Sequence, residues 1–137
     1  MEIRSIGIIG AGTMGNGIAQ VAAGAGFDVI LLDINDAALE KGLAALSKSL
    51  DRLIKKESIT SEQKAQTLAR IKTTTLYTDL ASVSLVIEAA TENQAIKEKI
   101  LAQVDQVVSK ETIIASNTSS ISITHLGSFN SRPERFI

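Results

Sequence analysis

The chain has no cysteine and no tryptophan, and it has one proline and one histidine among its 137 residues. Without cysteine, neither a disulfide framework nor a thiolate metal site can form, and we expect no metal centre. Aromatic residues make up 3% of the sequence, and the formal net charge is −1. A chain without a basic excess is not typical of proteins that bind nucleic acid or a membrane surface, so we expect neither partner.

Long apolar runs are also missing. No stretch reaches the length of a membrane span, and we expect no signal or transit peptide at the N-terminus. These features favour a cytoplasmic protein. The size of the chain and its 45% hydrophobic and 21% charged residues are typical of one globular domain with its own core, covering residues 1–137.

Short β-branched runs alternate with amphipathic helical patterns along the chain. We expect strands at Ser5–Gly10, Asp28–Asp33, Ile71–Thr75, Leu85–Ala89 and Thr112–Ser116. We expect helices at Thr13–Ala25 and Ala95–Val108, one that begins at a cap on Asn35 and runs to Lys56, and one that begins at a cap on Thr60 or Ser61 and runs to Ala69. The pattern predicts an α/β fold of the Rossmann type, a doubly wound, mostly parallel sheet with helices on both faces.

Glycines follow the first expected strand with the spacing of a dinucleotide-binding turn. The segment GAGTMG places Gly10, Gly12 and Gly15 in the pattern G-x-G-x-x-G, between an apolar run and a helical pattern. Gly10 allows a tight turn, Gly12 lets a pyrophosphate approach the backbone, and Gly15 lets the helix pack closely on the strand. The N-terminus of that helix offers N–H groups and a positive dipole end to the phosphates.

An acidic residue stands where such a site needs one. Asp33 ends the second expected strand, 33 − 15 = 18 residues after Gly15, close to the roughly 20 residues expected for the acid that binds a ribose hydroxyl. Ile34, Asn35 and Asp36 follow it without a cation for a 2′-phosphate, which favours NAD over NADP. The alternative is an aspartate that only caps the next turn.

Polar residues follow the fourth and fifth expected strands as well. Glu92 and Lys97 come after the fourth strand, and the segment Ser116–Ser120 follows the fifth. Because the carboxyl ends of parallel strands meet at one edge of the sheet, we expect these segments to converge with the glycine turn and Asp33 on one crevice. The structural alternatives are a solvated helix N-terminus for Glu92 and Lys97, and a capped turn for the serine-rich segment.

The remaining candidates are weaker. Arg52 and Lys56 are four residues apart on one helix face, where they either stabilise the helix C-terminus or hold the phosphates of a large acidic substrate. His125 has no carboxylate nearby to orient it, and we assign it to the surface or to a local cap. The serine-rich segment has no adjacent base, so we do not expect a serine nucleophile.

With these residues identified, the chain resembles the L-3-hydroxyacyl-CoA dehydrogenase family, and within it the 3-hydroxybutyryl-CoA members. The matching segments are GIIGAGTMGNGIAQVAAGAGFDVILLD, LVIEAATEN, ETIIASNTSSISIT and RPERFI. They cover essentially the whole chain, and the SNTSS block is more specific than the glycine turn alone. The resemblance implies reversible, NAD-linked oxidation of (S)-3-hydroxyacyl-CoA to 3-oxoacyl-CoA.

The resemblance also implies roles for individual residues. It assigns the pyrophosphate to Gly10, Gly12, Thr13, Met14 and Gly15, the adenosine ribose to Asp33, and the nicotinamide half to Glu92, Lys97 and Asn117. It assigns a hydrogen bond with the substrate oxygen to Ser119, and the CoA phosphates to Arg52 and Lys56. Arg52 departs from the lysine that the family pattern leads us to expect.

The resemblance further implies parts that the 137 residues do not include. Family members continue into a strand with G-M-H-F-F-N-P, whose histidine is the catalytic base, and then into a mostly helical domain that closes the substrate site and forms a dimer. We therefore expect an NAD-binding domain that is inactive alone and that exposes an apolar face, with a tendency to self-associate. The alternatives are a free-standing NAD-binding sensor or interaction module, and a dehydrogenase of hydroxy acids without CoA.

Overall fold

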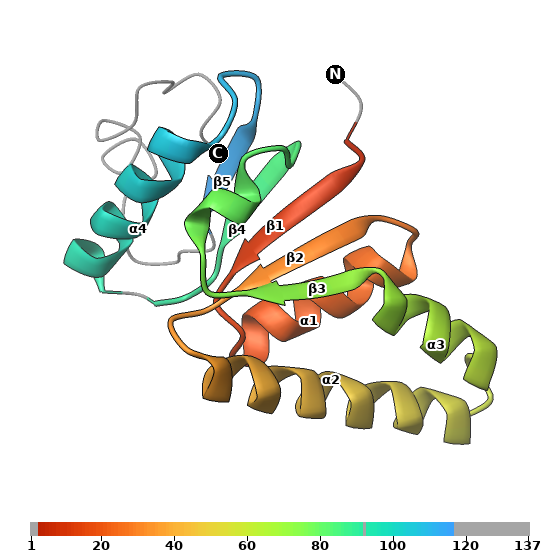
Figure 1. The fold of residues 1–137 in the computed structure, drawn as a ribbon. Coiled ribbons are helices and arrows are strands. Elements are labelled where there is room, and N and C mark those ends of the chain that lie inside the picture. Colours follow the sequence, from red (N-terminus) through yellow and green to blue (C-terminus); the bar gives the residue numbers. More distant parts are fainter. Residues whose placement is uncertain (1–2, 92, 117–137) are drawn as a thin grey trace.

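Five parallel strands form one sheet in the order β3-β2-β1-β4-β5 in the computed structural model, which describes residues 3–91 and 93–116 (Figure 1). The strands are β1 (Ser5–Ile9), β2 (Asp28–Leu32), β3 (Ile71–Thr74), β4 (Leu85–Glu88) and β5 (Ile113–Ser116). The helices are α1 (Thr13–Gly24), α2 (Asp36–Lys55), α3 (Ser61–Ala69) and α4 (Gln94–Val107), with a 3₁₀ helix η1 (Tyr77–Leu80).

The expected fold class is confirmed, and each expected strand and helix is present with ends within one residue of the prediction. The exception is η1, which the sequence did not predict because its four residues are too few to show a helical period. It packs directly on β1. A methyl group added at Gly7 would lie 2.7 Å from Leu80 Cδ2, so the glycine leaves the space that η1 fills.

Successive residues of each strand face opposite layers. On β1, Ile6 and Ile8 join the core that α1 and α2 cover, whereas Ile9 joins the core under α4 and η1. Figure 1 shows this division, with α1, α2 and α3 below the sheet and α4 above it. Alternating side chains thus fill two cores, one on each face.

The order of the strands reverses at the centre of the sheet. β1 pairs with β2 on one side and with β4 on the other, so Ile9 lies opposite both Leu32 and Glu88. Because all the strands are parallel, their carboxyl ends lie at one edge. A switch of this kind between neighbouring strands is where doubly wound sheets bind their ligands.

Side chains cap three of the helices at their N-termini. Asn35 accepts a hydrogen bond from Ala38 N–H at the start of α2, and Asn93 accepts one from Ile96 N–H at the start of α4. Thr60 and Gln63 form a reciprocal capping box at the start of α3. These bonds satisfy donors that a helix leaves unpaired in its first turn.

Two of the helices end with the same hydrogen-bonded turn but with different residues. After α1, Phe27 N–H donates to Ala22 O, and Gly26 takes a φ of +103°. After α2, Ser58 N–H donates to Leu53 O, and Glu57 takes a φ of +58°. Both are Schellman turns, which need a left-handed residue and usually place glycine there.

None of the helices within residues 3–91 and 93–116 combines the length and the hydrophobicity that crossing a bilayer requires.

Candidate functional site

The glycine turn between β1 and α1 depends on two glycines for its shape. Gly10 has a φ of +107°, and a methyl group added there would lie 2.7 Å from Ala90 Cα. A methyl group added at Gly15 would overlap the carbonyl oxygen of Gly10. The predicted tight turn and the close packing of helix on strand therefore both have a steric basis.

Gly12 differs from these glycines because it faces open space. It is exposed, and a methyl group added there would meet nothing within 4 Å in the described residues. Gly12 is also the N-cap of α1, and neither a side-chain cap nor an acidic residue in the first turn compensates this helix end, in contrast to α2, α3 and α4. The first N–H groups of α1 are thus available for an anion.

Asp33 connects the end of β2 to the glycine turn. Its Oδ2 accepts a hydrogen bond from Ala11 N–H at 2.7 Å, and its Oδ1 accepts one from Ile34 N–H at 2.6 Å. Asp33 therefore caps the turn that follows it and also holds the glycine turn. Each carboxylate oxygen has a second lone pair, and the half-buried side chain can still accept bonds from a ligand.

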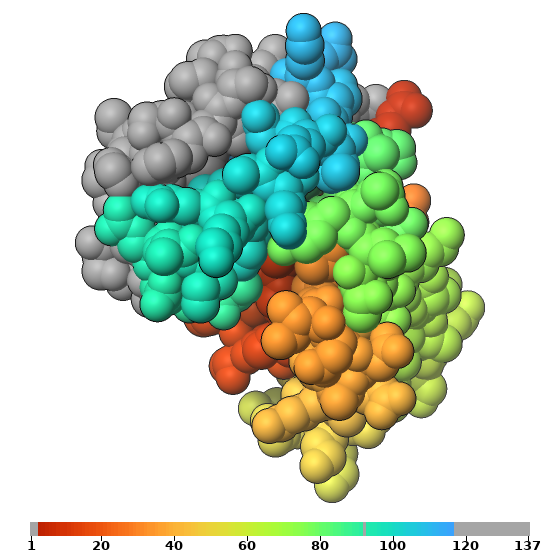
Figure 2. Space-filling model, turned by 60° about the vertical axis from the view of Figure 1, so that its left-hand side comes forward, coloured from red at the N-terminus to blue at the C-terminus, as the bar shows by residue number. Residues whose placement is uncertain are grey.

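A hollow of about 300 Å³ opens beside Gly12, Thr13 and Asp33, with Lys41 of α2 on its rim. The helix α2 approaches the turn closely here, because a methyl group added at Gly42 would lie 2.5 Å from Ala11 O. Figure 2 shows red surface of the N-terminal segment between the teal surface of α4 and the orange surface that follows β2.

The ends of β4 and β5 carry a buried polar cluster. Glu88 and Lys97 are both 0% exposed, and Lys97 Nζ forms an ion pair with Glu88 Oε1. Ser116 Oγ donates to the same oxygen at 2.8 Å, and Ala90 N–H donates to Glu88 Oε2 at 2.7 Å. Of the two alternatives for Lys97, the solvated helix N-terminus is therefore wrong, because the carboxylate of Glu88, nine residues earlier, pairs with its buried ammonium group.

Sequence reasoning missed Glu88, although a charged residue inside the apolar run LVIEA was a signal. It also missed Tyr77, which lies half-buried on η1. Burial raises the pKa of Tyr77 above its ordinary value of 10.0, and the negative charges of Asp33 and Glu88 raise that pKa further. The folded protein therefore favours the protonated phenol over the phenolate.

Several predicted residues lie elsewhere. Arg52 and Lys56 are exposed, at the opposite end of α2 from Asp33. Glu92, Asn117, Ser119 and His125 lie outside the described residues. Within the described part of the chain, no three His, Asp or Glu side chains are grouped in a way that could hold a metal ion.

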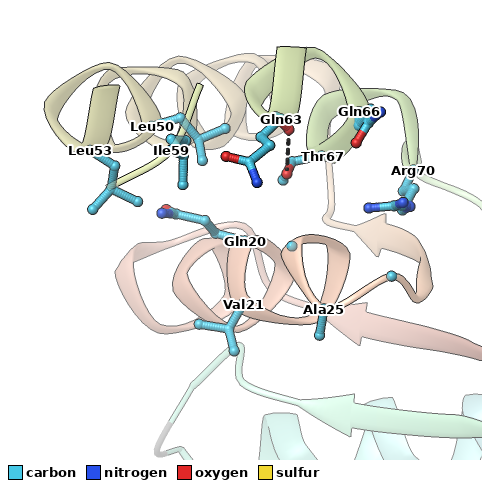
Figure 3. Close-up of a pocket in the computed structure, with 12 residues that line it drawn as sticks. Gln20, Val21, Ala25, Leu50, Leu53, Ile59, Gln63, Gln66, Thr67 and Arg70 are labelled. Carbon is cyan, nitrogen blue, oxygen red and sulfur yellow. Dashed lines mark hydrogen bonds between the residues drawn. The ribbon is translucent and has the colours of Figure 1, made fainter. Parts of the chain in front are cut away.

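A second hollow of about 390 Å³ lies between α1, α2 and α3, at the other end of α1 from the glycine turn (Figure 3). Its lining mixes apolar residues such as Leu50 and Ile59 with Gln20 and Gln63. Arg70, which also lines the hollow, donates from Nη1 to Ala23 O at 2.9 Å, so this cation already has a backbone partner. The hollow is remote from the carboxyl edge of the sheet and from the acidic residues described above.

Comparisons with known proteins agree with this geometry. The family model described as 3-hydroxyacyl-CoA dehydrogenase, NAD binding domain, matches residues 5–137. A 3-hydroxybutyryl-CoA dehydrogenase of Bradyrhizobium diazoefficiens is 48% identical over 98% of this chain. The crystal structure of (S)-3-hydroxybutyryl-CoA dehydrogenase from Ralstonia eutropha superposes with a TM-score of 0.98, at 59% identity over 99% of this chain.

These relatives are longer than the present chain. It spans 46% of the Bradyrhizobium protein and 48% of the Ralstonia chain. It also matches a fatty acid oxidation complex subunit alpha of Psychrobacter sp. at 40% identity, of which it spans 19%. The same domain is therefore joined to different additional segments in different relatives.

Proposed function

Because the chain belongs to the 3-hydroxyacyl-CoA dehydrogenase family, as its NAD-binding domain, we propose that it holds NAD for the oxidation of an (S)-3-hydroxyacyl-CoA by its parent enzyme. The observation that carries the proposal is the open N-terminus of α1, where Gly12 leaves room for a ligand and no described side chain caps the helix. A pyrophosphate fits this position because it is anionic and needs close access to backbone N–H groups.

Different residues bind different parts of the cofactor. Gly10, Gly12, Thr13, Met14 and Gly15 hold the pyrophosphate, and Asp33 accepts hydrogen bonds from the adenosine ribose. Asp33 also holds Ala11 N–H at 2.7 Å, so the carboxylate that recognises the ribose fixes the turn that binds the phosphates. A 2′-phosphate in place of the ribose hydroxyl meets this negative charge, which favours NAD over NADP.

We assign the nicotinamide half to the ends of β4 and β5, and its contacts to Glu92, Lys97 and Asn117. When bound, NAD supplies the hydride acceptor for the oxidation at C3 of the substrate. Ser119 donates a hydrogen bond to the substrate oxygen and so holds C3 in place. The base that removes the hydroxyl proton is the histidine of the parent enzyme's following strand, and for this reason the 137 residues alone are not expected to turn over substrate.

Arg52 and Lys56 bind the phosphates of CoA, a role that their exposure and their common helix face support. The C-terminal helical domain of the parent enzyme packs against an apolar hollow of about 480 Å³ beside α1, which Met14, Val21 and Ile87 line. The parent enzyme is a homodimer through that domain. It works in the cytoplasm, where NAD and acyl-CoA thioesters are both available.

The test is a titration of the folded chain with NADH and NADPH, read from nicotinamide fluorescence, which tryptophan does not obscure because the chain has none. We expect saturable binding of NADH and much weaker binding of NADPH. Absence of NADH binding at millimolar concentration would overturn the proposal. Joining the chain to a partner domain and assaying acetoacetyl-CoA then tests the activity, and free CoA as a competitor separates it from dehydrogenases of other hydroxy acids.

The substitution Asp33→Ala tests whether this carboxylate binds the ribose and selects NAD over NADP. The change removes a ribose acceptor and the charge that repels a 2′-phosphate, so NADH affinity should fall by about tenfold or more while the preference over NADPH narrows. Calorimetry with both cofactors measures the ratio. If the change only loosens the glycine turn, it should weaken the binding of NADH and NADPH equally. An unchanged ratio of the two affinities would therefore show that Asp33 does not bind the ribose.

A further inference from the structure

The buried cluster at the ends of β4 and β5 carries an inference about how the second half of the cofactor is held. Within residues 3–91 and 93–116, Glu88 and Lys97 are the two charged residues that are completely buried. Three donors meet the carboxylate of Glu88, and they come from three different segments. These donors are Ala90 N–H in the β4–α4 loop, Lys97 Nζ in the first turn of α4, and Ser116 Oγ at the end of β5.

A buried ion pair is weak evidence for a role in stability. Taking two charges out of water is costly, and apolar residues of similar volume often stabilise a fold equally well or better. Apart from these two residues, the buried polar or charged side chains of the described residues are those of Thr67 and Thr112, and both cores consist of apolar side chains. An ion pair at the carboxyl edge, where the ligand crevice lies, is better explained by what it positions.

The cluster also touches the glycine turn. A methyl group added at Gly10 would lie 2.7 Å from Ala90 Cα, so the turn rests on the same loop whose Ala90 N–H is held by Glu88 Oε2. The adenosine half of NAD belongs to the β2 side of β1, where Asp33 lies. Since β4 and β5 are on the opposite side of β1, the portion of the dinucleotide beyond the pyrophosphate lies over the segments that Glu88 holds.

We propose that Glu88 is a positioning residue for the nicotinamide half of NAD, because its carboxylate fixes Lys97, the Ala90 loop and the end of β5 relative to the glycine turn. This inference rests on the proposed function. The inference goes beyond the proposed function because it divides the cofactor site into two halves. The adenosine half is independent of Glu88, and the nicotinamide half depends on Glu88. The ionised carboxylate is required, since Lys97 brings a buried positive charge that only an anion balances.

The experiment compares two ligands on the 137-residue chain. NADH contains both halves of the cofactor, whereas ADP-ribose lacks the nicotinamide. We expect the unmodified chain to bind NADH more tightly than ADP-ribose. In Glu88→Gln, NADH affinity should fall about tenfold, which is the size of effect that one charge-assisted hydrogen bond has on binding. The affinity for ADP-ribose should stay within about twofold. The enhanced fluorescence of bound NADH should fall in the same variant.

Two further variants keep the test decisive. Asp51→Asn removes an exposed ion pair with Lys64, and it should leave both affinities unchanged. Glu88→Gln combined with Lys97→Met leaves no unbalanced buried charge, so it should fold even where Glu88→Gln alone does not. Because Lys97 is itself assigned to the nicotinamide half, this double variant tests the Glu88–Lys97 pair as a unit, and it should bind ADP-ribose normally and NADH weakly.

The outcomes separate the two proposals. If the unmodified chain binds neither ligand, the proposed function fails. If it binds both with equal affinity, or if the Glu88 variants weaken both in equal proportion, Glu88 is structural and the positioning role is overturned. Retention of full NADH affinity in the folded double variant overturns it as well.

Discussion

At the scale of single residues, the glycines of the turn between β1 and α1 have different roles. Gly15 is required by the fold, because a methyl group there would overlap the carbonyl oxygen of Gly10. Gly12 is not, because a methyl group there would meet nothing within 4 Å in the described residues. A glycine that the apoprotein does not need is best explained by the ligand that approaches it.

Exchanging each of these glycines for alanine should separate folding from binding. Gly12→Ala should change the free energy of unfolding by less than about 1 kcal/mol while it weakens NADH binding at least tenfold. Gly15→Ala should lower the free energy of unfolding by about 2 kcal/mol or more, since the clash is with backbone. Chemical denaturation and NADH titration measure the two effects, and normal NADH affinity in Gly12→Ala would contradict the assignment.

Tyr77 is the second residue whose chemistry can be isolated, because it is the single tyrosine of the chain. Burial, and then the charges of Asp33 and Glu88, raise its pKa above 10.0. The folded state therefore favours the protonated phenol more than the unfolded state does. The resulting stability is fully present below pH 10 and is lost as the pH rises through the folded pKa.

We expect the free energy of unfolding to fall as the pH rises above about 10, and to fall less steeply in Tyr77→Phe. The difference between the two proteins isolates the tyrosine from the lysines, which titrate in the same range. Ultraviolet absorbance of the tyrosinate gives the folded pKa directly. A midpoint at or below 10.0 would show that the hydroxyl is not under the influence of the two carboxylates.

The residue scale is also where sequence reasoning reached its limit. The shape of the glycine turn and the position of Asp33 beside it could be predicted, because both follow from a short, fixed spacing along the chain. The buried state of Lys97 could not, because it depends on Glu88 from another element and on Ser116 from a third. The sequence pattern predicts local geometry. Whether a charged side chain is buried or solvated depends on partners that the tertiary fold brings to it.

At the scale of elements, α1 and α2 end in the same type of turn but have different residues in its left-handed position. The turn after α1 has Gly26 in the left-handed region, where glycine carries no steric penalty. The equivalent turn after α2 has Glu57 at a φ of +58°, where a side chain costs about 1 kcal/mol. The exposed α2–α3 turn therefore holds a small strain that the α1–β2 turn lacks.

Glu57→Gly should raise the free energy of unfolding by about 0.5 to 1 kcal/mol, because it relieves this strain. Glu57→Ala is the matched control. It keeps the Cβ atom and should give almost no change. Gly26→Ala should lower the stability by about 1 kcal/mol. Thermal or urea unfolding checks all three, and equal stabilisation by alanine and glycine at position 57 would assign the effect to lost charge.

The elements themselves could be predicted almost completely, because short runs rich in β-branched or other apolar residues and amphipathic helical patterns follow one another with clear turn residues between them. The omission of η1 has a physical reason. Its position depends on the space above Gly7 rather than on any period of its own residues. A single turn of helix takes its stability from the surface on which it packs.

At the scale of the whole molecule, one face of α1 is incompletely covered by the described residues. Val21 is 74% exposed and Met14 is 55% exposed, and both line the apolar hollow of about 480 Å³. Large exposed apolar side chains gathered in one hollow are typical of a surface that meets another protein surface. This supports the proposed packing of a second domain there.

In the absence of that domain, we expect the chain to self-associate through the hollow, with a sedimentation coefficient that rises with concentration. Val21→Glu should suppress the association and leave the melting temperature almost unchanged, because the side chain is largely exposed. Leu76→Glu is the control, since Leu76 is 60% exposed but does not line the hollow. An equal effect of both changes would point to general solubility instead.

The reversal of strand order at β1 also governs how the molecule assembles. The pairing of Ile6 with Leu85 joins residues 85 − 6 = 79 positions apart, so closing this contact restricts a long stretch of chain and should be a slow event. Gly10 meets Ala90 only after that closure, and neither half of the sheet has a finished cofactor site before it. A nucleotide that recognises only the finished sheet should therefore lengthen the lifetime of the native state far more than it accelerates its formation.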